Sequence, residues 1–87
     1  EAFQLSQNYP NPFNPATTIR FSISKVGRYS VNVFNVLGQK VANLYDGLAA
    51  PGTYSVRFDA SHLSSGMYIY TLTGDGVNLA KKMALLK

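Results

Sequence analysis

The chain of 87 residues has no cysteine, no tryptophan and one histidine, and only four of its side chains are acidic. The lack of cysteine excludes a disulfide framework and thiolate metal sites, and it fits either a reducing compartment or an exported bacterial protein. No apolar run approaches the roughly 20 residues that span a bilayer, so no membrane span is expected. Residues 1–7 lack a basic region followed by an apolar stretch, so any N-terminal export signal is expected upstream of this fragment.

These shortages leave few groups for catalysis. The one histidine, His62, lies beside Asp59 and Ser61 in a predicted turn. A catalytic triad needs its members to converge from separate elements, so a capping aspartate and a solvated histidine are the expected roles. Asp46 and Asp75 also fall in predicted turns, and neither a calcium loop nor a phosphate loop is present. The sequence therefore predicts no enzyme, no metal and no cofactor.

The net charge of +4 does not indicate a nucleic-acid binder. Lysines and arginines occur singly along the chain, and only Lys81 and Lys82 are adjacent. A nucleic-acid binder clusters its basic side chains along one face or helix, so no nucleic-acid partner is expected. Isolated basic residues are instead typical of strand edges that must avoid unspecific pairing.

What the chain does have is alternation of apolar and polar residues with a period of two, which predicts half-buried strands. Expected strands are 17–24, 29–34, a short one at 41–45 ended by Asp46-Gly47, 52–58, 66–72 and a last one from about Leu79. Gly38 is expected in a tight turn with positive φ, and residues 74–76 in a hairpin. Residues 59–65 should form a corner, which Leu63 plugs.

The first distinctive segment, residues 8–15, contains three of the four prolines and is expected to form a rigid, turned lead-in. Tyr9 and Phe13 should fasten this lead-in to the rest of the domain. The predicted architecture is all-β: an immunoglobulin-like sandwich of six to seven antiparallel strands in two sheets. Residues 1–87 form one domain, with a lead-in at 1–16 and the sandwich at 17–87. Tyr68 follows the corner at the position of a tyrosine corner.

Aromatic side chains leave one question open. Most of the tyrosines and phenylalanines alternate into the core, but Phe34 and Tyr45 could be either buried or exposed. A carbohydrate-binding accessory module would need them exposed, and the lack of tryptophan argues against that function.

Seven short motifs then occur in order, none specific alone: NYPNPFNP at 8–15, TIRF at 18–21, VFNVLGQ at 33–39, GTY at 52–54, FDA at 58–60, LSSGMY at 63–68 and KKMALLK at 81–87. Together they closely resemble the type A C-terminal sorting domain of the type IX (Por) secretion system of Bacteroidetes. The immunoglobulin-like domain of flagellar hook-capping proteins shares much of this series and remains the alternative. The Lys-Lys-Met ending favours sorting.

The resemblance implies a domain that directs a larger cargo protein from the periplasm across the outer membrane, to the cell surface or into the medium. Its implied partners are the upstream cargo, the outer-membrane translocon and a sortase-like protease, with cleavage at or before Phe3. It also implies that the strand from Gly66 to Leu72 and the last strand are the recognition elements, the latter through an open edge that admits strand addition. The implied site residues are Gly66, Tyr68, Tyr70, Lys81, Lys82, Met83, Leu85 and Lys87.

Overall fold

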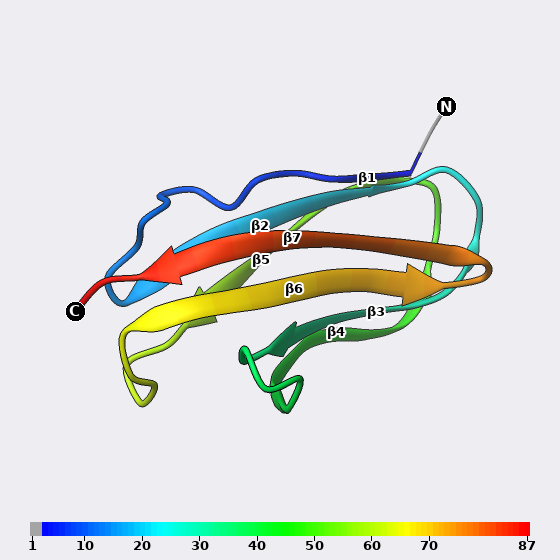
Figure 1. Ribbon diagram of the computed structural model, residues 1–87. Coiled ribbons are helices and arrows are strands. Elements are labelled where there is room, and N and C mark those ends of the chain that lie inside the picture. Colours follow the sequence, from blue (N-terminus) through cyan, green and yellow to red (C-terminus); the bar gives the residue numbers. More distant parts are fainter. Residues whose placement is uncertain (1–2) are drawn as a thin grey trace.

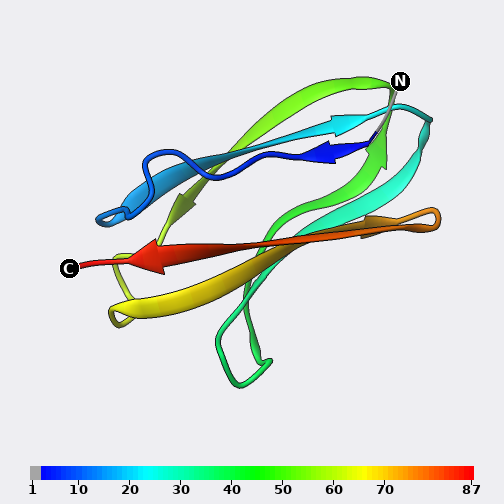
Figure 2. The same ribbon diagram turned by 45° about the horizontal axis from the view of Figure 1, so that its top comes forward.

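The computed structural model describes residues 3–87, which form seven strands and, within that range, no helix (Figure 1). The strands are β1 (Gln4–Leu5), β2 (Ala16–Ile23), β3 (Gly27–Phe34), β4 (Lys40–Ala49), β5 (Gly52–Asp59), β6 (Gly66–Gly74) and β7 (Val77–Leu85). They build two antiparallel sheets, ordered β1-β2-β5 and β4-β3-β6-β7, which lie over each other as two layers (Figure 2). The predicted β-sandwich is confirmed.

The core lies between the two sheets, because each strand turns its apolar row inward. In β2, β3 and β6 the buried residues alternate with polar or half-buried ones, as a period of two requires. The largest fully buried side chains come from both sheets and from the lead-in: Tyr29, Tyr70, Phe13, Phe21, Ile19, Leu72, Met83, Leu85, Val31 and Val33.

The lead-in is tied to the sandwich more extensively than the sequence indicated. Its first residues form β1, which pairs with β2 through Gln4–Ser22 and Leu5–Phe21. Phe13 is buried, as expected, and its ring lies 6.1 Å from that of Phe58. The prediction for Tyr9 is wrong for its side chain, which is 81% exposed; only its backbone is held, in a bridge to Thr18.

The strand predicted at 41–45 is longer than expected. β4 continues to Ala49, so Asp46 and Gly47 lie inside it rather than ending it. Asp46 pairs with Ser30 of β3, whose hydroxyl donates to the Asp46 carboxylate at 3.0 Å. A cross-strand partner thus replaces the turn that the Asp-Gly pair indicated. The pairing of β3 with β4 also contains two register shifts, between Val31 and Asn32 and between Val33 and Phe34.

The other predicted turns agree with the structure. Gly38 has a φ of 82°, and Asp75 and Gly76 have φ values of 46° and 81° between β6 and β7. The Asp59 carboxylate accepts from the Ser61 N–H at 2.9 Å. The hydroxyl of Tyr68 donates to the Ser64 carbonyl at 2.7 Å, which is the tyrosine corner.

Candidate partner-recognition surface

The β6–β7 hairpin is the scaffold of the predicted recognition surface. Its two strands pair without a register shift from Gly66–Leu85 to Gly74–Val77. The tight turn places both central residues at positive φ, which aspartate and glycine tolerate better than most residues do. Asp75 also forms an ion pair with Lys25, with 3.3 Å between the carboxylate oxygen and the ammonium nitrogen.

The structure divides the eight predicted site residues into two groups. Four are core residues that no partner can touch while the domain stays folded: Tyr68, Tyr70, Met83 and Leu85. The other four are exposed: Gly66, Lys81, Lys82 and Lys87. The buried group holds the hairpin against the opposite sheet, and the exposed group is available to a partner.

The outer edge of β7 is closed near its C-terminal end, so the open edge expected for the last strand is absent there. The Phe13 N–H donates to the Ala84 carbonyl, and the Leu86 N–H donates to the Phe13 carbonyl, both at 3.0 Å. The Asn11 side-chain oxygen accepts from the Ala84 N–H, also at 3.0 Å. The lead-in therefore acts as a short parallel strand along this part of β7.

A polar clasp, formed by Ser6, Gln7, Asn8 and Tyr70, continues this closure. The Tyr70 hydroxyl donates to the Ser6 carbonyl at 2.6 Å and accepts from the Asn8 N–H at 2.8 Å. Burial raises the pKa of Tyr70 from its ordinary value near 10, although the Asn8 bond lowers it in part, so the hydroxyl keeps its proton at neutral pH. The Gln7 amide nitrogen donates to the Lys82 carbonyl at 2.8 Å and to the Asn8 side chain at 2.7 Å.

Of the clasp residues, Tyr70 was predicted as a site residue, but Ser6, Gln7 and Asn8 were missed. The run of Asn and Pro indicated turns, but nothing in the local pattern shows that residues 7–13 return to a strand more than 70 residues later. A buried asparagine is unusual enough to mark a network once the fold is known: Asn8 also donates to the Thr17 hydroxyl and to the Pro10 carbonyl, both at 3.1 Å.

The other end of the β7 edge is open among the described residues. β7 is the last strand of its sheet and β1 the first strand of the other. Between them lies a groove of about 390 Å³, lined by residues 3–7 and by Leu79, Ala80 and Lys81. In Figure 1 β1 and the lead-in run above β7 along this side. Because the Ala84 backbone points outward and the alternation is regular, the backbone groups of Ala80 and Asn78 face the same edge.

The three lysines of the last strand lie in different surroundings. Lys81 lines the groove between β1 and β7. Lys82 lies opposite Ile69 on the outer face of the four-stranded sheet. Lys87 lies beyond β7, where its ammonium donates to the Ser61 carbonyl at 2.6 Å and its N–H to the Ser65 hydroxyl at 2.9 Å.

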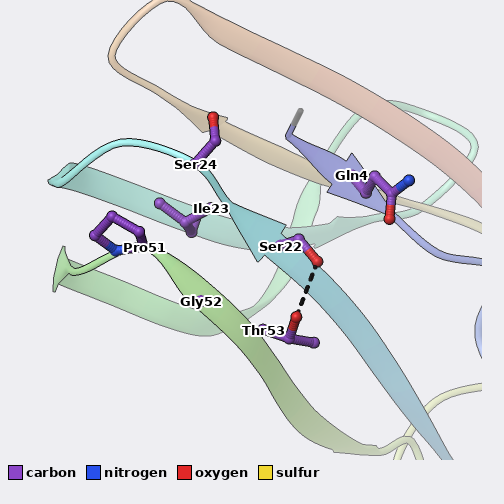
Figure 3. A pocket seen from close by; sticks show the side chains of 7 residues that line it. All are labelled: Gln4, Ser22, Ile23, Ser24, Pro51, Gly52 and Thr53. Carbon is purple, nitrogen blue, oxygen red and sulfur yellow. Dashed lines mark hydrogen bonds between the residues drawn. The ribbon is translucent and has the colours of Figure 1, made fainter. Parts of the chain in front are cut away.

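No catalytic constellation gathers among residues 3–87. Within that range no three His, Asp or Glu side chains lie close enough to hold a metal ion, and His62 is exposed. A polar hollow of about 460 Å³ lies at the end of β2 and β5, where the Ser22 and Thr53 hydroxyls are 3.2 Å apart (Figure 3). None of its lining side chains titrates near neutral pH: Gln4, Ser22, Ile23, Ser24, Pro51, Gly52 and Thr53.

The two aromatic residues left open are both half-buried. The Tyr45 ring packs against those of Phe21 and Tyr54, with centroids 5.7 and 6.1 Å away. Phe34 lies on the outer face of its sheet, opposite Ile69. They therefore do not form a shared flat aromatic platform.

Comparison with known protein families decides between the remaining functions. The family model of the secretion system C-terminal sorting domain matches residues 7–85, which include the lead-in from Gln7 onward and strands β2 to β7. The chain belongs to this family. It is a sorting signal of type IX secretion, so the protein that carries it is exported to the cell surface or released. No curated protein matches the chain, and neither the hook-capping nor the carbohydrate-binding alternative is supported.

The family also gives the sorting domain its kinds of partner: the type IX secretion machinery and an upstream cargo. No helix within residues 3–87 is long and apolar enough to cross a membrane.

Proposed function

We propose that the domain takes its cargo through the outer membrane by offering the open part of the β7 edge, around Asn78 and Ala80, to the translocon. The observation that carries the proposal is that the lead-in covers the outer edge of β7 at Ala84 but leaves Asn78 and Ala80, among the described residues, without a strand neighbour on that outer side. An unpaired edge is a template for an added strand, which supplies main-chain hydrogen bonds.

The regularity of β7 supports its choice over β4, the opposite edge of the same sheet. β4 pairs with β3 through two register shifts, and such irregularities interrupt the row of edge donors and acceptors. β7 pairs with β6 without any shift, so its outward groups keep the spacing of a strand. Lys81 and Lys82 flank this edge and discourage unspecific pairing while favouring an acidic partner.

The remaining recognition residues then have distinct roles. Met83 and Leu85 anchor β7 in the core, and Tyr68 and Tyr70 anchor the neighbouring strand and the lead-in. Gly66, with a φ of 153°, starts β6 at the corner. Lys87 lies beside the same corner and adds a third positive charge.

The rest of the proposed pathway follows the resemblance. The domain itself has no enzymatic activity; it passes through the periplasm, and a sortase-like protease then cuts at or before Phe3 and the cargo is attached to the cell surface. A cut before Phe3 lies outside the described residues. Because β1 begins at Gln4, such a cut would leave the folded domain whole.

The test is a fusion of residues 1–87 to the C-terminus of a folded reporter, expressed in a host with the type IX machinery. We expect the reporter in the medium or on the cell surface. A reporter that stays in the periplasm contradicts the proposal. Deletion of residues 81–87 should abolish export, although it also removes two core residues.

A charge reversal separates recognition from folding. The double variant Lys81→Glu and Lys82→Glu changes two exposed residues and should lower export several-fold with little change in melting temperature. The matched control is Arg20→Glu with Arg57→Glu, which makes the same change of charge on exposed residues of the other sheet. Equal export by both double variants contradicts the role given to β7.

A further inference from the structure

The turn between β3 and β4 exposes two adjacent aliphatic side chains. Val36 is 72% exposed and Leu37 is 80% exposed, and Met67 at the start of β6 is 46% exposed. Figure 2 shows this turn projecting away from the rest of the sandwich. These three residues are called the turn patch below; Val36, Leu37 and Met67 line one hollow of about 260 Å³ together with residues 64–66.

The turn patch is held rigidly rather than left loose. The Asn35 side-chain oxygen accepts from the N–H groups of Leu37 and Gln39, at 2.9 and 3.0 Å. Its amide nitrogen donates to the Gln39 side chain at 2.8 Å, and backbone bonds join Asn35 to Gly38 and Gln39 at 3.0 Å. A turn fixed in this way loses little conformational entropy when its aliphatic tip is buried by a partner.

Beside the turn patch, one row across the sheet has an apolar middle and basic ends. Lys40 of β4 pairs with Phe34, Phe34 with Ile69, and Ile69 with Lys82 of β7. Phe34 and Ile69 are half-buried, and both lysines are exposed. An apolar surface bordered by lysines is complementary to an apolar pocket bordered by carboxylates.

No acidic side chain among residues 3–87 neutralises these lysines. Asp46 pairs with Ser30, four residues along β3 from Phe34, and Asp75 forms its ion pair at the hairpin turn. The Asp59 carboxylate caps the Ser61 N–H at the end of the other sheet. The positive charge of the row is therefore uncompensated.

We propose that the turn patch, with Lys40 and Lys82 at its border, is a second docking site that inserts into an apolar, carboxylate-rimmed pocket of an outer-membrane protein of the type IX machinery. This inference rests on the proposed function, because it names a further contact with the same machinery. Ser64 and Ser65 also line the hollow, and serine hydroxyls form directional hydrogen bonds with a protein that lipid tails cannot form. A second copy of the domain is a less complementary partner, because the border lysines of the two copies would face each other and repel.

The experiment uses the reporter fusion in the type IX host. A photo-crosslinking amino acid replaces Leu37 in one fusion and Leu48 in another; Leu48 is 66% exposed on the same sheet at its opposite end. We expect a crosslink from position 37, and none from position 48, to one outer-membrane protein of the export machinery. Leu37→Asp should lower export at least tenfold, Leu48→Asp should leave it unchanged, and both should melt near the parent temperature.

The charge of the border is tested by Lys40→Glu, with Arg28→Glu as the control at the far end of the sheet. We expect export to fall several-fold in the first and to stay at the parent level in the second. Normal export of the parent fusion together with normal export of Leu37→Asp overturns the docking site while the sorting function stands. Retention of the parent fusion in the periplasm overturns the sorting function itself.

Two further results would overturn the choice of partner. The purified domain could bind vesicles of phosphatidylethanolamine and phosphatidylglycerol through Leu37, which would indicate a membrane surface. It could also self-associate in sedimentation experiments in a way that Leu37→Asp abolishes, which would indicate a second copy. Crosslinks of equal yield from positions 37 and 48 overturn the site as well.

Discussion

Strand β7 pairs with β6 along its whole inner edge, but the two ends of its outer edge differ: one is covered by the lead-in and the other is open. Near Ala84 the lead-in supplies two backbone hydrogen bonds and the Asn11 side chain a third. Around Asn78 and Ala80 the same edge faces a groove. The comparison shows how a small domain can leave part of a strand edge open and limit its length. The lead-in closes one part, and the part that stays open is too short to invite unspecific pairing along the whole strand.

The largest effect is expected from Phe13→Ala, which removes the apolar anchor of the closed end. The side chain is 2% exposed, so its loss leaves a cavity that costs about 3–5 kcal/mol of unfolding free energy. For a domain of this size that corresponds to a fall in melting temperature of at least about 12 °C. Thermal unfolding measures it. Tyr9→Ala, in the same segment but exposed, should change stability by less than about 0.5 kcal/mol; an equal fall in both variants contradicts the assignment of Phe13 as anchor.

Tyr70→Phe tests the clasp with a smaller change. It removes the hydroxyl that holds Asn8 N–H and Ser6 C=O, so about 1–3 kcal/mol of unfolding free energy should be lost. Hydrogen exchange at the Asn8 amide should quicken as well. Tyr54→Phe is the control, because its hydroxyl bonds only the exposed Ala50 carbonyl and its loss should matter less. Unchanged exchange at Asn8 would show that the clasp does not hold the lead-in.

Asn11→Ala should partly open the covered end of the β7 edge, so that its amide protection approaches that of the open end. The Ala84 N–H loses its acceptor while Phe13 stays in place, at a cost of about 0.5–1.5 kcal/mol of unfolding free energy. Amide exchange at Ala84 should rise toward that of Ala80, whose N–H already points outward. Asn14→Ala in the same lead-in should leave Ala84 protected.

The smallest effect concerns pH and the corner beside the lead-in, where the Ala60 N–H donates to Pro15 C=O at 2.8 Å. Hydrogen bonds from the Ser61 N–H and hydroxyl hold the pKa of Asp59 below its ordinary value. Because the folded pKa is the lower one, this stabilisation is present above the unfolded value of about 3.9 and is lost as pH falls through the folded value. The protection factor of the Ala60 amide, which corrects for the intrinsic pH dependence of exchange, should fall in acid, and Asp59→Asn should remove most of that fall.

Much of the fold was predictable because it depends on local signals. Alternation located the strands, and the positive-φ turns at Gly38 and Asp75-Gly76 agree with the structure because few other residues tolerate them. The turn predicted at Asp46-Gly47 is absent, because the cross-strand hydrogen bond from Ser30 to Asp46 outweighs the turn preference of the Asp-Gly sequence. The prediction that the Tyr9 side chain fastens the lead-in was wrong, because the sequence of a proline-rich segment does not show which way an aromatic ring points.

The candidate site was predictable only in part. The family motifs located the last strand, but a motif does not separate Met83, which packs in the core, from Lys82, which is exposed. The closure of the β7 edge depends on contacts between residues more than 70 positions apart, such as Asn11 with Ala84. Pairing at that separation has no signature in either segment alone.

The most direct test of the open edge is export of the reporter fusion carrying Ala80→Pro, compared with Ala80→Val. The Ala80 N–H points away from β6, so proline removes an edge donor without removing a hydrogen bond of the β6–β7 pair, and valine keeps the donor. If the translocon reads this edge, the proline variant stays in the periplasm as a folded domain while the valine variant is exported like the parent. Export of a folded Ala80→Pro fusion at the parent rate would contradict the account.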